Sequence, residues 1–414
     1  MQLDPAISNP AVEEKRLDDG KWPNLTFILG HAASLDLASQ TLSLSTGQSI
    51  SFDRLCVATG ARPVKLLGVT PELAGQILTL RDTDSVEKLA ANLERARSVA
   101  LIGNGGIALE LVHALHTLDI TWIVKHAHIA DAFFDIDAAD FLLDILRARR
   151  CAAASHARKA RGEAAAGRLV IEAHSSVRSV RPGALPGSST IPPATRTGLE
   201  LELSSGKRVA ADVAVAALGV VPNTEWVSGA LERGPTGGIL VNDRLESVSA
   251  LGRVWAAGDA CDLSVLEARP PDGSQWFQMR LWTQARSQGI LAAHAMAGVD
   301  EETGASMAFE LFTHVTSFAG HKVVLLGRYN AQGLDDEPAE DIRSYCRTSP
   351  PDDQGRGGTF VRLLLRKDRV EGAVLIGDTE LEEAVEHLIL DRLVVGHLMP
   401  GLLDPDAELD HVFD

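Results

Sequence analysis

Short apolar runs separated by turn residues characterise the first part of the chain. Three of them surround Gly and Asn positions and predict a β-meander, at residues 25–29, 41–44 and 49–52. Residues 55–60 form a further apolar run that ends in glycine, which is typical of a buried strand. Over 82–97 the apolar positions recur at helical spacing, and Asp82 or Thr83 is placed to cap that helix.

The remaining pattern alternates strands and helices. A strand, a helix and a second strand are predicted over 98–124, which together form a βαβ unit. Later elements are predicted as a helix near 137–149, strands at 199–203 and 212–218, a strand, loop and buried strand over 238–257, and a helix over 279–297. From 309 onward a smaller module is predicted, with strands at 323–326, 359–365 and 369–376 and a helix at 381–394. This order predicts an α/β fold with Rossmann-like domains and a small α+β C-terminal domain.

Residues 152–196 change in composition. They are rich first in Ala, Arg and Gly and then in Pro and Ser, with little apolar periodicity. Such a segment buries too little apolar surface to support a core of its own. We expect most of it to be an exposed and partly disordered insertion.

The charge balance narrows the classes of partner. The 414 residues are enough for two or three domains, and the net charge is −17. This acidic balance argues against direct nucleic-acid binding and against an anionic membrane surface. No apolar run approaches the length of a membrane span, and residues 1–19 resemble neither a signal peptide nor a transit peptide.

The reactive residue types show few recognisable patterns. Four cysteines are scattered along the chain without a CxxC or CxxxxC pair, so we expect neither a metal site nor a local redox disulfide. This usage fits a reducing compartment. The thirteen histidines include no HExxH, and no GxSxG elbow of a serine hydrolase occurs.

The most informative motif lies inside the βαβ unit. Residues 103–108 read GNGGIA and match the dinucleotide fingerprint G-x-G-x-x-G/A, with a strand before them and a helix after them. Gly103 permits the tight turn, Gly105 lets a pyrophosphate approach the backbone, and Ala108 lets the helix pack close to the sheet. The helix N-terminus offers N–H groups to the phosphates, so Gly103, Asn104, Gly105, Gly106 and Ala108 are predicted to bind a nicotinamide nucleotide.

The second strand of this unit departs from the usual pattern. An acidic residue for the ribose normally stands about 20 residues after the fingerprint. Here strand 120–124 is followed by Lys125. Lys125 either attracts a 2′-phosphate or is merely solvated, and the choice between NADH and NADPH stays open.

Three further motifs resemble the pyridine nucleotide-disulphide oxidoreductases, a family of flavoproteins that bind two dinucleotides. They are ATGARP at 58–63, ALGVVPN at 217–223 and VWAAGD at 254–259. The resemblance implies FAD and NAD(P) as cofactors. It places the first segment at a domain crossover and the second segment near the nicotinamide nucleotide. It assigns cofactor contacts to Thr59, Gly60, Gly219, Gly258 and Asp259, the last as acceptor for the ribityl chain.

Two more residues gain a role from the same resemblance. Met279 begins the predicted helix whose N-terminal dipole faces the flavin. Glu110 either pairs locally or lies near the nicotinamide ribose, as in relatives. Cys56 and Cys261 are expected to be buried thiols with a packing role. His314 is expected to be structural, since no disulphide partner is found for it.

Longer segments of the chain resemble one subfamily that lacks the redox-active cysteine pair. They include residues 101–111, 279–286, 323–334 and 372–383. The resemblance implies an FAD-dependent, NAD(P)-linked oxidoreductase of the nucleus and cytoplasm, linked to oxidative-stress protection. Hydride transfer between two bound cofactors needs no protein nucleophile, so no catalytic side chain is expected. A protein partner could bind through the C-terminal domain.

One departure from the family concerns the start of the FAD domain. Relatives begin with their own GxGxxG, and residues 1–57 contain none. We therefore expect an incomplete FAD domain. The alternative to an enzyme is a nucleotide-binding or interaction protein that has lost FAD. The expected domains are a partial FAD domain at 1–80, an NAD(P) domain at 81–220 with the insertion, a return to the FAD domain at 221–300, and the C-terminal domain at 305–414.

Overall fold

The computed structural model describes residues 23–161, 167–184, 197–268, 274–299 and 309–404. They form two compact units. The larger unit contains the described residues of 63–219 and 312–404, and the smaller unit contains those of 23–62 and 220–311. Each unit is therefore built from two separate stretches of chain.

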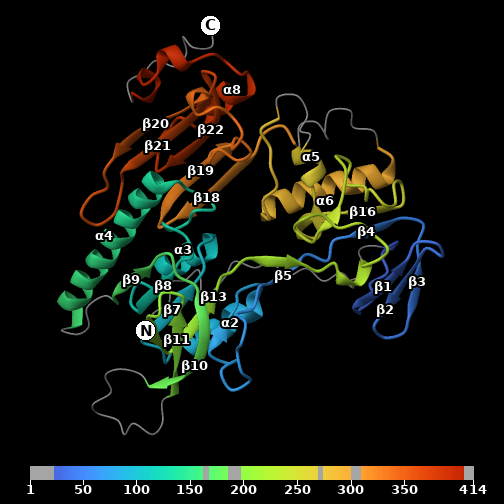
Figure 1. Ribbon diagram of the computed structural model, residues 1–414, viewed down its shortest axis with the longest axis horizontal. Helices are drawn as coiled ribbons and strands as arrows, with labels where there is room; N and C mark the ends of the chain where they lie inside the picture. The colour runs from blue at the N-terminus through green and yellow to red at the C-terminus, as the bar shows by residue number, and fades with distance from the viewer. Residues whose placement is uncertain (1–22, 162–166, 185–196, 269–273, 300–308, 405–414) are drawn as a thin grey trace. The chain divides into compact units, whose positions relative to one another are not determined.

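A five-stranded parallel sheet lies at the centre of the larger unit (Figure 1). Its order is β6 (Ile77–Leu78), β13 (Val213–Ala216), β7 (Ser98–Ile102), β8 (Asp119–Ile123) and β9 (Leu169–Glu172). The connecting helices are α2 (Thr83–Leu93), α3 (Gly106–Ala114) and α4 (Ile136–Arg161). This arrangement confirms the predicted Rossmann-like fold.

The boundary of this unit lies earlier than the sequence suggested. It falls after Arg62 rather than at residue 80. The reason is β6, which pairs in parallel with β13 and so belongs to the same sheet as β7. Helix α2 begins as predicted, because Asp82 accepts the Ser85 N–H at 2.9 Å and the Ser85 hydroxyl bonds back to the cap in a capping box.

The segment at 152–196 is more ordered than expected. Helix α4 continues to Arg161, strand β9 completes the parallel sheet, and β10 (Val177–Ala184) pairs with β11 (Thr197–Leu203), which pairs with β12 (Arg208–Ala211). The composition concealed β9 because it is only four residues long, and it concealed β10 because arginine and proline interrupt its apolar positions. The expectation for 162–166 and 185–196 lies outside the described residues.

The C-terminal part of the larger unit is the predicted α+β module, and in the described residues it is an antiparallel sheet whose strands at 313–318 and 342–349 were not predicted. Its strand order is β18 (Thr313–Phe318), β19 (His321–Gly327), β22 (Arg369–Ile376), β21 (Thr359–Arg366) and β20 (Ile342–Ser349), with α8 (Glu382–Leu390) packed against it. Helix α4 runs beside this sheet (Figure 1), where the Phe141 and Phe360 ring centroids are 5.7 Å apart. Phe318 also makes edge contacts with Phe133 and Phe134, which attach the sheet to the Rossmann-like part.

The smaller unit contains several short sheets. The first is antiparallel, with β1 (Ala32–Asp36), β2 (Thr41–Leu44) and β3 (Ser49–Ser51). The parallel pairs are β4 (Leu55–Val57) with β16 (Val254–Ala256) and β15 (Ile239–Leu240) with β17 (Cys261–Asp262), while β5 (Ala61–Pro63) pairs with β14 (Val220–Pro222). The helices are α5 (Ser264–Ala268) and α6 (Trp282–Ala297).

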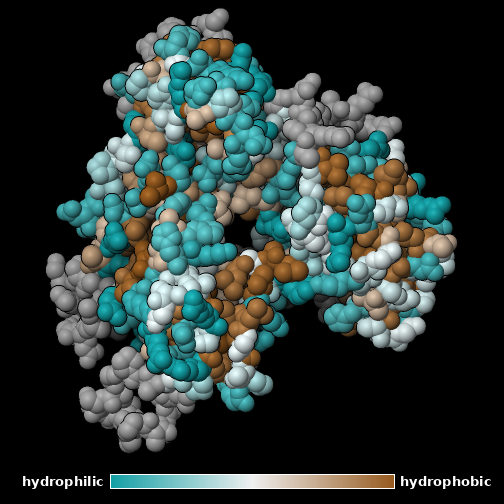
Figure 2. Space-filling view, viewed as in Figure 1, coloured by the Kyte–Doolittle hydropathy of each residue, from teal (hydrophilic) through white to brown (hydrophobic). Residues whose placement is uncertain are grey.

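Two expectations for this unit are corrected. Residues 25–29 are not a strand; their apolar side chains are exposed and the first strand begins at Ala32. Helix α6 begins at Trp282, so Met279 precedes it. Hydrophobic side chains remain on the visible face of this unit (Figure 2), and its exposed apolar residues include Leu251, Trp282 and Ile290.

Candidate functional site

The turn between β7 and α3 can be made only by glycine at its first position. Gly103 has φ +130°, and a Cβ placed there would lie 2.0 Å from the Ala217 carbonyl oxygen. The Gly103 carbonyl accepts a 2.7 Å hydrogen bond from the buried Trp122 indole, and its N–H donates to the Ile123 carbonyl at 3.1 Å. The turn is thus held by both neighbouring strands, β13 and β8.

The residues after this turn leave room for a ligand. Gly105 is the N-cap of α3, and nothing lies within 4 Å of the position a Cβ would take there. The first N–H groups of a helix have no acceptor within it, so those of α3 are available to an anion. Ala108 is fully buried and holds the helix close to the sheet. The geometry therefore fits a pyrophosphate at Gly105 and Gly106.

The side chain of Asn104 has a structural contact. Its amide donates to the His128 carbonyl at 2.9 Å and to the Asp131 carboxylate, and its oxygen accepts the Ala130 N–H at 2.5 Å. Asn104 therefore fixes the loop after β8 onto the glycine turn. We infer that Asn104 contributes to nucleotide binding through its backbone and through this loop.

That loop also contains Lys125. Lys125 is exposed directly after the Rossmann-like strand, where the ribose of a dinucleotide lies in this fold. The nearby carboxylate of Asp131 pairs with His126 as well as with Asn104. Among the described residues no carboxylate is paired with Lys125, so its charge remains available to a phosphate.

Glu110 lies on α3 one turn beyond the glycines. Partial desolvation raises the pKa of its carboxyl group, although the residue keeps solvent contact. A proton is therefore retained on Glu110 to a higher pH than on an ordinary glutamate. Its position on the ligand-binding helix is compatible with the nicotinamide-side role that the family resemblance implies.

The two crossover motifs bind each other. Thr59 Oγ1 donates to the Asn223 carbonyl at 2.8 Å, and the Asn223 amide donates back to the Thr59 carbonyl at 3.0 Å. Gly60 has φ +64° and accepts the Asn223 N–H at 2.9 Å. Gly219 has φ +86°, and its carbonyl accepts the Val64 N–H at 2.9 Å. Thr59, Gly60 and Gly219 therefore shape the crossover.

The GD motif lies in a short 3-10 turn packed on α6. Gly258 has φ +66°, its N–H donates to Gln288 Oε1 at 2.8 Å, and a Cβ on it would lie 3.4 Å from the Ala285 Cβ. Asp259 is partly exposed in this turn, and Arg280 Nε donates to its carbonyl at 3.4 Å. The partly exposed Asp259 and the first turn of α6 fit the ribityl and ring side of a flavin.

The N-terminal end of α6 is formed by Gln284 and Met279. The Met279 N–H donates to Gln284 Oε1 at 2.8 Å, and Gln284 Nε2 donates to the Phe277 carbonyl at 2.9 Å. Met279 thus acts as part of the turn that leads into the helix. Trp282, the first helical residue, is 91% exposed.

Two buried residues near the GD motif were missed by sequence reasoning. Gln288 contacts Gly258, as described, and Asp262 accepts the backbone N–H groups of Thr236 and Ser264 at 3.0 Å each. A Cβ on Gly234 would lie 2.2 Å from the Asp262 carboxylate carbon, so this approach requires glycine. The signal available in the sequence was a second acidic residue three positions after Asp259.

Cys261 is buried, as expected, whereas Cys56 is exposed, so the buried packing role expected for Cys56 is wrong. All four cysteines are free thiols, and Cys261 is buried with its Sγ–H 3.2 Å from the Gly258 carbonyl. Burial raises the pKa of Cys261 to about 12, so it stays a thiol at neutral pH. Burial lowers the pKa of His314, whose Nδ1 has no hydrogen-bond partner among the described residues.

The described residues also show what other chemistry they offer. They include no group of three His, Cys, Asp or Glu side chains placed to hold a metal ion. No helix within them combines the length and apolarity that a bilayer crossing requires. For FAD, Gly258, Asp259 and α6 fit the flavin side, whereas the second GxGxxG that would hold the ADP side does not occur in the printed sequence of the smaller unit.

Comparison with known proteins places this geometry in context. The family model described as pyridine nucleotide-disulphide oxidoreductase matches residues 9–181 and 185–289. Pyridine nucleotide-disulfide oxidoreductase domain-containing protein 1 of Pongo abelii is 32% identical over 453 residues, covering 95% of this chain and 85% of the relative. The protein of the same name in Danio rerio is 33% identical over 456 residues, covering 100% and 89%.

Solved structures show the same fold. A ferredoxin reductase from Rhodopseudomonas palustris superposes with a TM-score of 0.72 at 18% identity, covering 99% of this chain and 89% of that one. Putidaredoxin reductase, in its covalent complex with putidaredoxin, gives 0.65 at 20% identity, covering 92% and 79%.

Proposed function

Because the chain belongs to the pyridine nucleotide-disulphide oxidoreductase family, we propose that it is an FAD-dependent, NAD(P)-linked oxidoreductase that works without a redox-active cysteine pair. The observation that carries the proposal is the glycine turn at 103–108, where Gly103 cannot be replaced and Gly105 faces open space. The structural neighbours, which include reductases, support the same class of reaction.

The protein residues bind and orient in this proposal. The α3 N-terminus binds the pyrophosphate of the nicotinamide nucleotide. Lys125 follows the strand that faces the ribose in this fold, and in this proposal its positive charge attracts the 2′-phosphate of NADPH. Gly258 and Asp259 hold the flavin side of FAD, beside the first turn of α6. When both are bound, the nicotinamide supplies a hydride that the flavin accepts.

The thiols near the flavin-side residues do not enter the chemistry in this proposal. Cys261 keeps its proton at neutral pH because its pKa is about 12. The other three cysteines lie far from it in the sequence and none is paired. The proposal therefore assigns these thiols no redox role, and it requires an acceptor from outside the chain.

We propose a reducing compartment, the cytoplasm or nucleus, and a role in oxidative-stress protection as the setting. The four unpaired thiols support the compartment, since such thiols persist where disulfides are kept reduced. We also propose a protein acceptor that docks on the C-terminal domain; the neighbour that was solved with putidaredoxin supports a protein partner of this kind, without indicating the docking site.

The test is the visible spectrum of the purified chain during anaerobic titration with NADH and NADPH. A yellow protein whose flavin band is bleached by either nucleotide supports the oxidoreductase. A folded, colourless protein that still binds nicotinamide nucleotide would instead support the alternative function, a nucleotide-binding or interaction protein without FAD.

A further inference from the structure

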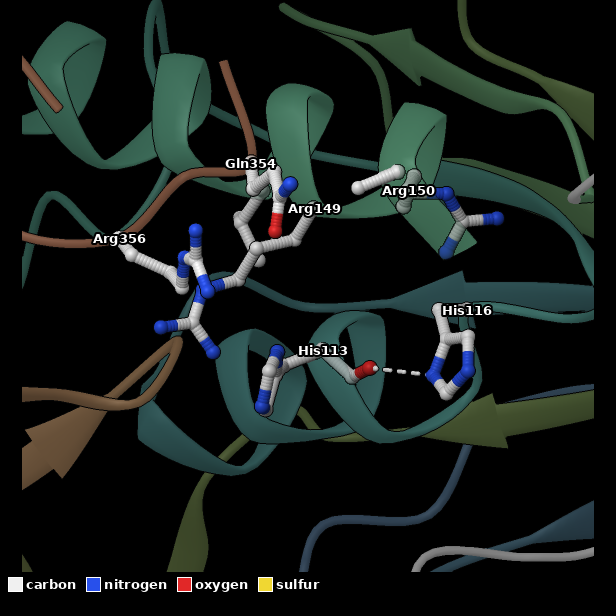
Figure 3. A pocket seen from close by; sticks show the side chains of 8 residues that line it. His113, His116, Arg149, Arg150, Gln354 and Arg356 are labelled. Atoms are coloured by element: carbon white, nitrogen blue, oxygen red, sulfur yellow. Dashed lines mark hydrogen bonds between the residues drawn. The ribbon is translucent and has the colours of Figure 1, made fainter. Parts of the chain in front are cut away.

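A pocket in the larger unit lies at the end of α3 opposite the glycine turn. It opens where α3, α4 and the loop between β20 and β21 meet, and its volume is about 280 Å³ (Figure 3). The nine residues of α3 separate the two ends by about 13 Å, at 1.5 Å per residue. The pocket is therefore a different place from the dinucleotide turn. Its polar lining consists of His113, His116, Arg149, Arg150, Gln354 and Arg356.

The loop between β20 and β21 is pressed against α4 at Arg149. Arg149 Nε donates to the Gly355 carbonyl at 3.0 Å. Gly355 has φ +68°, and a Cβ there would lie 2.8 Å from both Arg149 Cγ and the Ile145 carbonyl oxygen, so only glycine allows this approach. The next residue in the loop is Arg356. Figure 3 shows the Arg149 and Arg356 side chains extending from these two elements toward His113.

A third arginine belongs to the wall of the pocket. Arg150 is 5% exposed and donates to the Leu118 and Gly167 carbonyls at 2.7 and 2.8 Å and to the Val112 carbonyl at 3.2 Å. Its Nε is buried without a partner among the described residues. Burial lowers the pKa of Arg150 to about 10, so it remains a cation at neutral pH.

Among the described residues around this pocket, positive charge exceeds negative charge. The acidic group in contact with the lining is Asp352, which binds Arg356 Nε at 3.1 Å, and Asp119 acts on Arg150 only through its field. Burial removes solvation from Arg149 and lowers its pKa, and the field of Asp352 opposes this shift. Asp352 is thus bonded to one of these two guanidinium groups and acts on the other only through its field, and this ratio of charges attracts a second anion.

The floor of the pocket is apolar. Leu146 and Ala152 line it together with the carbon stems of the arginines. An inorganic ion would contact only the guanidinium groups, whereas an anion with a carbon body would also cover this floor.

We propose that this pocket binds a small organic oxyanion, a phosphate ester or a carboxylate with an apolar body, between Arg149 and Arg356. The oxyanion accepts hydrogen bonds from both guanidinium groups, and the carbon body lies on Leu146 and Ala152. The site is independent of the proposed redox function, because it uses the opposite end of α3.

The test is calorimetric titration of the purified chain with phenyl phosphate and benzoate, with inorganic phosphate and phenol as partial probes. We expect saturable binding of phenyl phosphate or benzoate, the tighter one identifying the anion class. Inorganic phosphate and phenol are each expected to bind at least about tenfold more weakly, since each lacks half of the contacts.

Three variants locate the binding. Arg356→Ala should weaken phenyl phosphate binding about tenfold by removing one charged donor. Asp352→Asn keeps the acceptor oxygen of the loop and removes the competing charge, so it should strengthen binding. The matched control is Arg343→Ala. Arg343 pairs with Asp368 at 3.1 Å on the same sheet, and its side chain is 55% exposed against 66% for Arg356. This control should leave binding unchanged.

The variant Gly105→Val tests whether phenyl phosphate binds at the dinucleotide turn instead. This variant should preserve phenyl phosphate binding. Three outcomes would overturn the proposal: no saturable binding up to about 10 mM of either probe, equal losses in Arg356→Ala and Arg343→Ala, or loss of phenyl phosphate binding in Gly105→Val. The last would place the probe at the glycine turn, and it would leave the proposed oxidoreductase function standing.

Discussion

Replacing Gly105 by valine should separate nucleotide binding from folding. Apart from its neighbours in the chain, no atom of the described residues lies within 4 Å of the position of the new Cβ, and the backbone there has φ −93°, which valine adopts readily. The cost to the protein is the loss of a favourable N-cap residue, about 1 kcal/mol. The branched side chain occupies the space in front of the first N–H groups of α3, where the pyrophosphate must approach.

The expected loss of affinity follows from the bonds that the pyrophosphate cannot make. A charge-assisted hydrogen bond contributes about 1.5–3 kcal/mol, so blocking two of them weakens binding by about a hundredfold or more. Calorimetric titration with NADH and NADPH measures this loss, and thermal unfolding measures the stability of the same samples. Gly105→Ala is the matched control, since its single methyl group leaves more of the space open and should reduce affinity less.

Replacing Gly103, the first glycine of the turn, should instead reduce the stability of the fold. A Cβ on Gly103 would lie 2.0 Å from the Ala217 carbonyl oxygen, and φ +130° is strained for alanine. Gly103→Ala should therefore lower the unfolding temperature markedly, with a loss of several kcal/mol in the free energy of unfolding.

Unchanged NADH and NADPH affinity in Gly105→Val would refute the assignment of the pyrophosphate to this turn.

Four further predictions follow from the same geometry. Lys125→Glu should lower the affinity for NADPH more than for NADH in parallel titrations, and equal effects would show that Lys125 is only solvated. The printed chain carries one glycine fingerprint, so gel filtration should leave less than one FAD per chain by absorbance, and full retention would contradict this. Iodoacetamide at pH 8 should label the other cysteines before Cys261, whose pKa is about 12, and mass spectrometry of the native protein would show the reverse if the thiol were reactive. Asp82→Ala should destabilise the larger unit by about 1 kcal/mol in urea unfolding, since the Asp82 capping box is lost.

The sequence predicted the elements whose local signals agree with their surroundings. The βαβ unit and the Asp82 cap combine apolar periodicity with a turn or cap residue, so their positions were confirmed. The prediction of a strand at 25–29 was wrong. Its apolar side chains are exposed, and this segment pairs with no strand of the described residues. Helix α4 extended beyond 149 because alanine and arginine favour a helix without an apolar stripe.

Contacts between distant segments could not be predicted in this way. Asp262 fixes the segment at 234–236 by accepting the Thr236 N–H and by its close approach to Gly234, and no local pattern links these positions. The same holds for Arg149 and Arg356, which belong to a helix and a loop that only the folded chain brings together. The side chain of Asn104 was assigned to the cofactor by its motif, yet it holds the loop at 128–131.

The position of β13 has a consequence for synthesis of the chain. β13 lies between β6 and β7 in the parallel sheet, although it follows both in the sequence. While the ribosome is still translating the residues before Val213, β6 and β7 have no strand between them, and the Ala217 carbonyl that contacts the glycine turn has not been made. The nascent chain must therefore emerge past residue 217 before its nucleotide site can form, so an interruption before that point leaves an exposed parallel edge for chaperones to protect.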